Sequence, residues 1–289
     1  MLAPSQLSPT FDFKKVKLTK QSDIYVKSPS DTHGCKVTDL AVLPGDLLLL
    51  ADDHNQSMKL VNPVSGQLLD QLQLSDSPHG LCLLPGDRAA VTIPGESTIQ
   101  TISVTNKKLA LHEVINVKGR CFGVDFVNDY FVVGFSYPAQ VAMVDRHGTI
   151  CKSITTGFKE PFKYPNSICV TNEHTGNVIY VSDHGTRTIT RLSEDLQVLQ
   201  SFTSPAFEEP RGLAPVGGGQ LLVMDGCPWP VLPSTLQVLD VTTGTFTRLM
   251  AWEAGMSYTS CVAVSHPLGT VYVPSRWRGG DVVRQYRIT

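Results

Sequence analysis

Several side chains in this sequence are of the types that bind metal ions. Asp52, Asp183 and Asp225 each end a short apolar segment, and His79 precedes another. Converging carboxylate and amide oxygens favour Ca²⁺, whereas a group of histidines favours Zn²⁺, and either ion could support hydrolase or lyase chemistry. The aspartates have a simpler role open to them, because a carboxylate can accept backbone N–H groups where a strand ends. His79 stands alone, which favours a hydrogen-bonded turn residue.

Other catalytic patterns are missing from the sequence. It contains no glycine-rich phosphate loop, no Gly-x-Ser-x-Gly and no His-Glu-x-x-His, since His112-Glu113 continues as Val114-Ile115-Asn116. The seven cysteines are scattered, and no two are separated by the two residues typical of zinc or redox pairs. We therefore expect reduced, buried thiols in a cytoplasmic protein, although Asn55-Gln56-Ser57 would be a glycosylation acceptor in a secreted one.

A different chemistry, recognition of a partner, is suggested by two loops that contain tryptophan. Arg276-Trp277-Arg278 precedes Gly279-Gly280, and an exposed tryptophan between two arginines favours a binding role. Trp229 lies in residues 227–233, where three prolines could pre-organise it for contact. The alternative for that loop is a rigid cap over the centre of the fold.

Composition limits the classes of partner. The chain has 289 residues, 42% hydrophobic and 17% charged, with a formal charge of −2. No overall positive field attracts nucleic acid or acidic membranes, and no apolar run approaches the roughly 20 residues that span a bilayer. Residues 1–10, rich in Pro and Ser, are expected to be a linker or disordered lead to a single domain over 11–289.

The elements that position these residues repeat six times. A short apolar strand recurs, and its anchors are Leu40, Leu81, Val124, Ile168, Leu213 and Val262. The intervals are 41, 43, 44, 45 and 49 residues, which is the period of propeller blades. After each anchor come a turn, a second aliphatic strand such as 47–50 or 178–181, and a more polar hairpin. This pattern predicts an all-β fold, a six-bladed β-propeller with four antiparallel strands per blade.

The two ends of the chain predict how the ring closes. The last repeat stops at residues 282–288, which form its third strand. Residues 11–18 precede the first repeat and have apolar side chains at 11, 13, 16 and 18. Pairing 11–18 outside 282–288 would complete blade six and close the ring.

The blade motifs resemble those of NHL-repeat propellers along residues 11–289. They are Pro-His-Gly-Leu at 78–81, Pro-Arg-Gly-Leu at 210–213, Val-Ser-Asp at 181–183, Val-Met-Asp at 223–225 and the Asp-x-x-Gly hairpins. Three blades depart from the pattern, with Ile93, Phe135 and Ser275 in place of the aspartate. The resemblance implies similarity to the C-terminal domain of TRIM-NHL proteins, where such propellers recognise protein or RNA. Ligase activity would need RING and B-box parts that this sequence lacks.

In a propeller, the blade-to-blade loops and the loops after the second strands share one face. We expect the binding residues there, and they are Arg276, Trp277, Arg278, Lys163, Tyr164, Arg211, Trp229, Lys118, Arg120 and His79. The same loops contain Tyr137, His184 and Arg187, with Glu208 and Glu209 diluting the positive charge. Each of these residues could instead have no binding role, because a charged side chain can simply keep a loop hydrated and an aromatic ring can simply pack over a blade.

The same face argues against a metal centre. The positions that would ring the channel are Thr38, His79, Phe122, Asn166, Arg211 and Thr259. Asn166 is the natural oxygen ligand among them, and Arg211 would repel a cation. We therefore expect no metal and no cofactor.

The sequence thus predicts a non-catalytic, monomeric interaction domain that does not bind membranes. A protein partner is favoured over RNA because RNA affinity depends on phosphate neutralisation. The alternatives are a calcium-dependent hydrolase or lyase of the six-bladed type, and an assembly surface on the outer strands or the opposite face.

Overall fold

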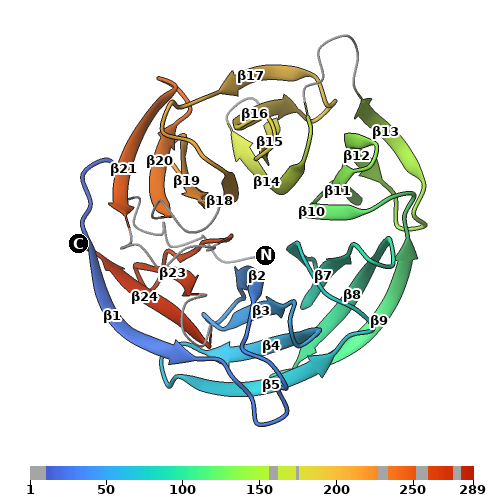
Figure 1. Cartoon of the computed structure of the whole chain (residues 1–289), viewed down its shortest axis with the longest axis vertical. Helices are drawn as coiled ribbons and strands as arrows, with labels where there is room; N and C mark the ends of the chain where they lie inside the picture. Colours follow the sequence, from blue (N-terminus) through green and yellow to red (C-terminus); the bar gives the residue numbers. More distant parts are fainter. Residues whose placement is uncertain (1–10, 156–161, 174–175, 227–233, 252–259, 276–280) are drawn as a thin grey trace, which may run out of the picture.

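The computed structural model describes residues 11–155, 162–173, 176–226, 234–251, 260–275 and 281–289. These residues form twenty-four strands in six four-stranded antiparallel sheets, arranged around a central axis (Figure 1). The predicted six-bladed β-propeller is confirmed. No helix long and apolar enough to cross a bilayer occurs in this part of the chain.

The blades follow one another along the chain, each built from its innermost to its outermost strand. Blade one contains β2 (Val37–Val42), β3 (Leu48–Asp52), β4 (Ser57–Asn62) and β5 (Gln67–Gln73). Blade two contains β6 (Leu81–Leu84), β7 (Arg88–Ile93), β8 (Thr98–Thr105) and β9 (Lys108–Asn116). Blade three contains β10 (Cys121–Val127), β11 (Tyr130–Ser136), β12 (Ala139–Val144) and β13 (Ile150–Thr155).

The remaining blades have the same plan with one exception. Blade four contains β14 (Pro165–Glu173), β15 (Gly176–Asp183), β16 (Thr188–Ser193) and β17 (Val198–Phe202). Blade five contains β18 (Pro210–Gly217), β19 (Gln220–Asp225), β20 (Thr235–Asp240) and β21 (Thr245–Ala251). Blade six has the strand order β1 (Leu18–Tyr25), β24 (Val282–Ile288), β23 (Thr270–Ser275) and β22 (Ala263–Ser265). Its outermost strand therefore comes from the other end of the chain.

The core lies between the blades. Six clusters of buried apolar side chains occur in the described residues, and each joins two neighbouring blades. Between blades two and three, for example, Ile99 packs in one cluster with Phe131 and Phe135. The second strand of a blade packs against a neighbouring blade on each of its two faces. This explains why β3 is buried along its whole length and why its sequence is almost entirely aliphatic.

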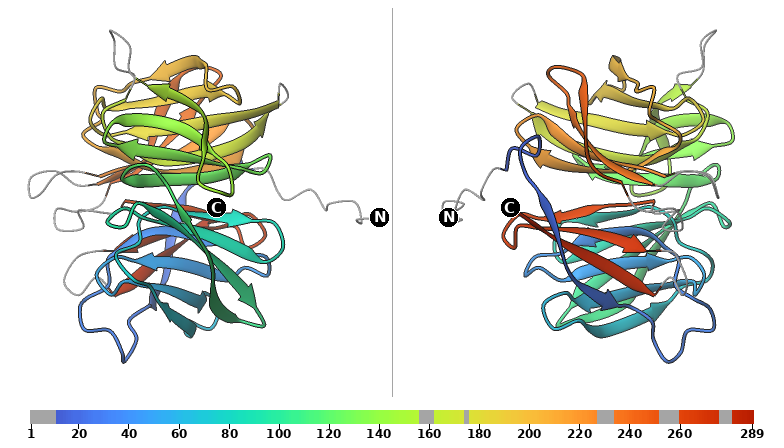
Figure 2. Two further views of the ribbon diagram at one scale, coloured as in Figure 1. Left: turned by 90° about the vertical axis from the view of Figure 1, so that its right-hand side faces the viewer. Right: turned by 60° about the vertical axis from the view of Figure 1, so that its left-hand side comes forward.

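Ring closure by a strand near the start of the chain is confirmed, but the predicted residues were wrong. The closing strand is β1, whose Leu18 lies opposite Ile288 and whose Tyr25 lies opposite Val282 (Figure 2). Of the predicted segment 11–18, Phe13 is fully buried in the cluster between blades five and six, where Phe11 also packs. The apolar pattern at 11–18 thus reflects packing between blades. The true outer strand is mostly polar because it buries little more than Ile24.

Candidate binding face at the mouth of the channel

The innermost strands approach one another so closely that the channel is narrow. An added Cβ at Gly80 would lie 2.3 Å from the backbone oxygen of Phe122, and one at Gly212 would lie 2.6 Å from Cα of Cys261. Glycine is therefore required where neighbouring blades meet at the axis. Larger side chains stand directly before these glycines, namely His79 before Gly80, Phe122 before Gly123 and Arg211 before Gly212.

Blades two and three contribute a chain of three interacting side chains at this mouth. The ring of His79 meets the ring of Phe122 edge to face, with centroids 5.0 Å apart. The guanidinium carbon of Arg120 lies 5.7 Å from the centroid of Phe122. An arginine at this distance from an aromatic face gains from cation–π attraction while its N–H groups stay free for a partner.

Blade four adds an aromatic pair. Tyr164 and His184 stack with centroids 5.0 Å apart and planes 11° apart, and Tyr164 is 41% exposed. Both loops that carry them are fixed by Asp183. Its carboxylate accepts the N–H groups of Lys163 at 2.6 Å and Tyr164 at 2.9 Å, and also those of Gly185 and Thr186. The aromatic pair is therefore pre-organised by one buried carboxylate.

The recurrent aspartates have the structural role that the sequence suggested. Asp225 accepts the N–H groups of Glu208 and Glu209, and Asp52 accepts that of Lys36. Burial raises the pKa of Asp225 to about 6, against these hydrogen bonds. These carboxylates accept backbone N–H groups of the blade-to-blade loops and so help to hold those loops in place.

The charge of Arg211 acts on both histidines of the mouth. Its Nε and Nη2 donate to Oε2 of Glu209 at 3.1 and 2.5 Å. Burial, followed by the charge of Arg211, lowers the pKa of His79 to about 4 and lowers that of His184. Both imidazoles are therefore neutral at pH 7. Their Nδ1 atoms are buried and have no hydrogen-bond partner in the described part of the chain.

Several charges of this face are already neutralised by neighbours. Lys36 pairs with Asp53, and Arg187 lies 3.7 Å from Glu208. Lys118, Arg120 and Lys163 form no ion pair with any residue that the structure describes. The face thus offers local cations and aromatic rings within a nearly balanced charge.

Six of the ten predicted binding residues can be placed. The structure brings together His79, Arg120, Lys163, Tyr164 and Arg211 near the mouth, while Lys118 is exposed on the loop before blade three. Trp229, Arg276, Trp277 and Arg278 lie outside the described residues. Sequence reasoning considered Phe122 as a metal-ring position and missed it as a contact residue. The signal was its position in the repeat, since Phe122 lies two residues before the anchor Val124, as His79 lies two residues before the anchor Leu81. We call the described set of His79, Arg120, Phe122, Lys163, Tyr164, His184 and Arg211 the loop face.

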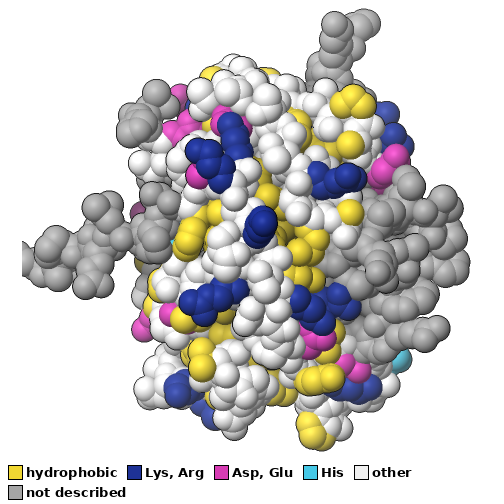
Figure 3. Space-filling view, turned by 90° about the vertical axis from the view of Figure 1, so that its left-hand side faces the viewer, with side chains coloured by type: hydrophobic (Ala, Val, Ile, Leu, Met, Phe, Trp, Pro, Cys, Tyr) yellow, Lys and Arg dark blue, Asp and Glu magenta, His cyan; other side chains and the backbone are white. Residues whose placement is uncertain are grey.

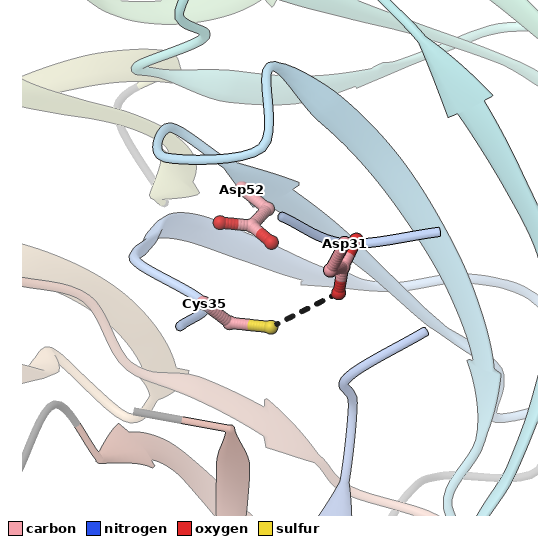
Figure 4. Close-up of side chains that lie close together, drawn as sticks. All are labelled: Asp31, Cys35 and Asp52. Carbon is pink, nitrogen blue, oxygen red and sulfur yellow. Dashed lines mark hydrogen bonds between the residues drawn. The ribbon is translucent and has the colours of Figure 1, made fainter. Parts of the chain in front are cut away.

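One cluster away from the loop face has the composition of a metal site. Asp31, Cys35 and Asp52 point toward one another, and the Cys35 Sγ lies 3.5 Å from Oδ2 of Asp31 (Figure 4). The ammonium of Lys59 lies among them, 2.5 Å from Asp31 Oδ2, 2.8 Å from Asp52 Oδ2 and 3.1 Å from Cys35 Sγ. A cation is therefore already in place. We call these four residues the Lys59 cluster.

The Lys59 cluster is fully buried, and its ionisation follows from its geometry. Hydrogen bonds from Lys59 and Asn55 hold the pKa of Asp52 below its usual range, although burial opposes this. Burial raises the pKa of the Cys35 thiol well above its usual range, which favours the protonated thiol in this cluster. Sequence reasoning singled out Asp52 but missed Asp31, Cys35 and Lys59, because Lys59 lies in a strand, β4, whose neighbouring residues Met58 and Leu60 are apolar.

Fold and site together define a six-bladed β-propeller with a polar, aromatic mouth. No protein-family model matches the sequence, and no curated protein matches it. The resemblance to NHL repeats therefore rests on the motifs alone.

Solved structures with the same fold are numerous, and three illustrate the range. A protein of unknown function from Bacteroides thetaiotaomicron has a TM-score of 0.69 at 12% identity, covering 93% of this chain and 76% of that one. A streptogramin B lyase has a TM-score of 0.63 at 11% identity, covering 93% and 97%. Kuenenia stuttgartiensis hydrazine synthase has a TM-score of 0.62 at 13% identity, covering 86% and 76%. At such identities the likeness concerns the fold.

Proposed function

We propose that this chain is a non-catalytic interaction domain that binds a protein partner through the loop face. The observation that carries the proposal is the presence at the mouth of two contact groups, Arg120 over Phe122 and the stacked pair Tyr164 and His184. Tyr and Arg are the residues that most often dominate binding energy at protein interfaces.

The backbone hydrogen bonds of the loops support the same proposal. Because Asp183 fixes the loops of Lys163 and Tyr164, little conformational freedom is lost when a partner orders them. Tyr137, which is 70% exposed in the loop after β11, extends the aromatic surface outward. A rigid surface with a few exposed aromatic rings suits a protein epitope that contributes an acidic or apolar side chain.

The charges of the face favour protein over RNA as the partner. Lys36, Arg187 and Arg211 each have an acidic neighbour, which leaves few cations to neutralise phosphates. RNA binding without such cations would be weak. In its narrowest form, guided by the NHL resemblance, the proposal makes this domain the substrate-recognition part of a TRIM-like ubiquitin ligase.

The absence of catalysis is supported by how the candidate groups are used. Asp52, Asp183 and Asp225 are engaged by backbone amides, and the Lys59 cluster contains its own cation. Elemental analysis of native protein provides a direct test. A stoichiometric calcium or zinc ion would contradict the proposal and favour the calcium-dependent hydrolase or lyase.

The binding test compares two double variants. Arg120→Glu with Tyr164→Ala changes the loop face, whereas Lys152→Glu with Tyr130→Ala makes the same chemical changes elsewhere in blade three. Partners captured by the wild-type chain after ribonuclease treatment would be purified and measured by calorimetry. We expect the first variant to weaken binding by about 100-fold, equivalent to the loss of two hot-spot residues, and the second to stay within twofold. Equal binding by both variants, or loss of every partner on ribonuclease treatment, would refute the proposal.

A further inference from the structure

The charge of this chain is distributed very unevenly. Residues 11–27 and 281–289 contain seven lysines and arginines against three aspartates, a formal side-chain charge of +4. The whole chain has a formal charge of −2, so the rest of the molecule carries −6. The two positive segments lie far apart in the sequence.

Ring closure brings these segments together. β1 pairs with β24 along its length, and the backbone of Lys17 exchanges two hydrogen bonds with that of Thr289. Figure 3 faces this side of the molecule and shows Lys and Arg side chains scattered over its surface, with few acidic ones. We call the exposed cations of the two segments the basic wall, and they are Lys14, Lys15, Lys17, Lys20, Lys27 and Arg287.

Two of these cations are free to meet a partner. Thr19 lies opposite Arg287, so the side chains of Lys17 and Arg287 are diagonal neighbours on one face of the sheet. Neither forms an ion pair with a residue that the structure describes. The other lysines form ion pairs, of which those of Lys20 with Asp23 at 3.1 Å and of Lys27 with Asp281 at 3.8 Å have an exposed lysine. Exposed pairs of this kind are weak and exchange readily with a stronger partner.

Protection of an exposed sheet edge does not account for the whole wall. A charge or two on an outer strand is enough to discourage edge-to-edge association. All six outer strands follow that rule, because β5 and β17 contain no Lys or Arg, and β1, β9, β13 and β21 contain one each. Blade six has four further lysines flanking β1 and two arginines on β24. This excess indicates a partner of opposite charge.

We propose that the basic wall binds an acidic segment of a protein partner. Asp12, Asp23 and Asp281 are interspersed among the cations, a pattern that suits a protein segment better than a continuous row of phosphates. The charge of −6 on the rest of the molecule would repel a long nucleic acid. Tyr25, 72% exposed, is the one exposed aromatic side chain of the two segments, whereas binding of single-stranded nucleic acid uses a series of stacking rings.

The basic wall is on the outer side of the ring and does not include any residue of the loop face. The two surfaces can therefore be tested independently, and failure of one leaves the other unaffected. A partner with an acidic tail could contact both surfaces at once. Binding at one surface would then raise the local concentration of the tail at the other, and the overall affinity would increase.

The test measures binding of a fluorescent 20-residue poly-L-glutamate to the purified chain at low salt. We expect binding that weakens as salt rises and that falls about tenfold in the double variant Lys17→Glu with Arg287→Glu. The control variant Lys107→Glu with Lys152→Glu changes the net charge equally on blades two and three, and we expect it to bind within about twofold of wild type. Circular dichroism melting curves should be alike for all three proteins, because every substituted side chain is exposed.

Three results would overturn the proposal. Equal loss in the control variant would mean that only net charge matters. Tighter binding of a 20-nucleotide poly-U RNA than of poly-glutamate would make the wall a nucleic-acid surface. Self-association of the wild-type chain in light scattering, abolished by Lys17→Glu with Arg287→Glu, would make a second copy the partner.

Discussion

The Lys59 cluster and the loop face both hold polar groups out of water, but they differ in how the hydrogen-bonding capacity of those groups is satisfied. In the Lys59 cluster the ammonium has three acceptors, Asp31, Asp52 and Cys35. At the loop face, the buried Nδ1 atoms of His79 and His184 have no partner in the described part of the chain. A buried polar group without a partner costs stability, so such groups are more often kept for binding than for folding. The comparison separates a structural site from a candidate functional one.

The Lys59 cluster stabilises the place where the ring closes. Asp31 lies in the segment between β1 and β2, and it also accepts the N–H of Ser28 at 2.8 Å and Nε2 of Gln71 at 3.0 Å. The N–H of Cys35 donates to Asp281 Oδ1 at 2.9 Å. The cluster thus connects blade one with the segment that leaves the closing strand and with the start of β24.

The largest effect is expected from removing the cation of this cluster. Lys59→Met would leave Asp31 and Asp52 buried without a counter-charge, and we expect it to lower the free energy of unfolding by about 3–5 kcal/mol at pH 7. Chemical denaturation measures the change. The deficit should shrink as the pH falls, because burial would raise the pKa of the unpaired carboxylates and protonation would then relieve the cost.

A second variant serves as the control for that experiment. Lys59→Met combined with Asp31→Asn and Asp52→Asn removes all three charges, so its stability should depend less on pH than that of Lys59→Met alone. If Lys59→Met lowered the free energy of unfolding by less than about 1 kcal/mol, the Lys59 cluster would not be a structural site, and its contrast with the loop face would be lost.

The fold was predictable from the sequence because the apolar strand pattern that specifies a blade is local and occurs six times. The six anchors from Leu40 to Val262 correspond to the six innermost segments, and strong aliphatic runs such as 47–50 lie in second strands. The closing strand was harder to locate. β1 is an outer strand with one well-buried side chain, Ile24, and so lacks the apolar alternation by which a strand is recognised.

The site was predictable only in part because its contacts join different blades. Loop membership predicted His79, Arg120, Tyr164 and Arg211 on one face, since topology alone assigns loops to a face. The edge-to-face contact between His79 and Phe122 depends on the spacing of blades two and three. The Lys59 cluster likewise depends on Asp31, which belongs to a segment without repeat signals, reaching a strand of blade one.

A pH experiment sharpens the comparison by using a second carboxylate, that of the half-buried Asp39. Asp39 accepts the N–H groups of Leu40 and Leu81 but has no cation beside it. Burial, with the charge of Asp125 adding to it, raises its pKa from 3.8 to about 7, whereas Lys59 helps to hold the pKa of Asp52 below its usual range. The two carboxylates therefore shift in opposite directions.

The sign of the effect follows from the raised pKa of Asp39. The stability that comes from protonating Asp39 is complete below pH 3.8 and is lost as the pH rises through 7. Between pH 5 and pH 8 we expect the wild-type free energy of unfolding to fall by about 2 kcal/mol more than that of Asp39→Asn. Urea denaturation at both pH values measures this difference. Parallel pH profiles for the two proteins would show that Asp39 is ionised throughout.

The smallest effect on stability is expected at the loop face. Arg120 is exposed, forms no ion pair with a described residue and contacts one ring, that of Phe122, at 5.7 Å. Arg120→Ala should therefore change the free energy of unfolding by about 0.5 kcal/mol or less. Phe162→Ala, which empties a fully buried position in the next blade-to-blade loop, should cost about 3 kcal/mol and shows that the assay detects a structural loss. A loss of about 2 kcal/mol in Arg120→Ala would place Arg120 with Lys59 among the residues that hold the fold together. In that case the loop face would contribute to folding as the Lys59 cluster does, and the two regions would not differ in role.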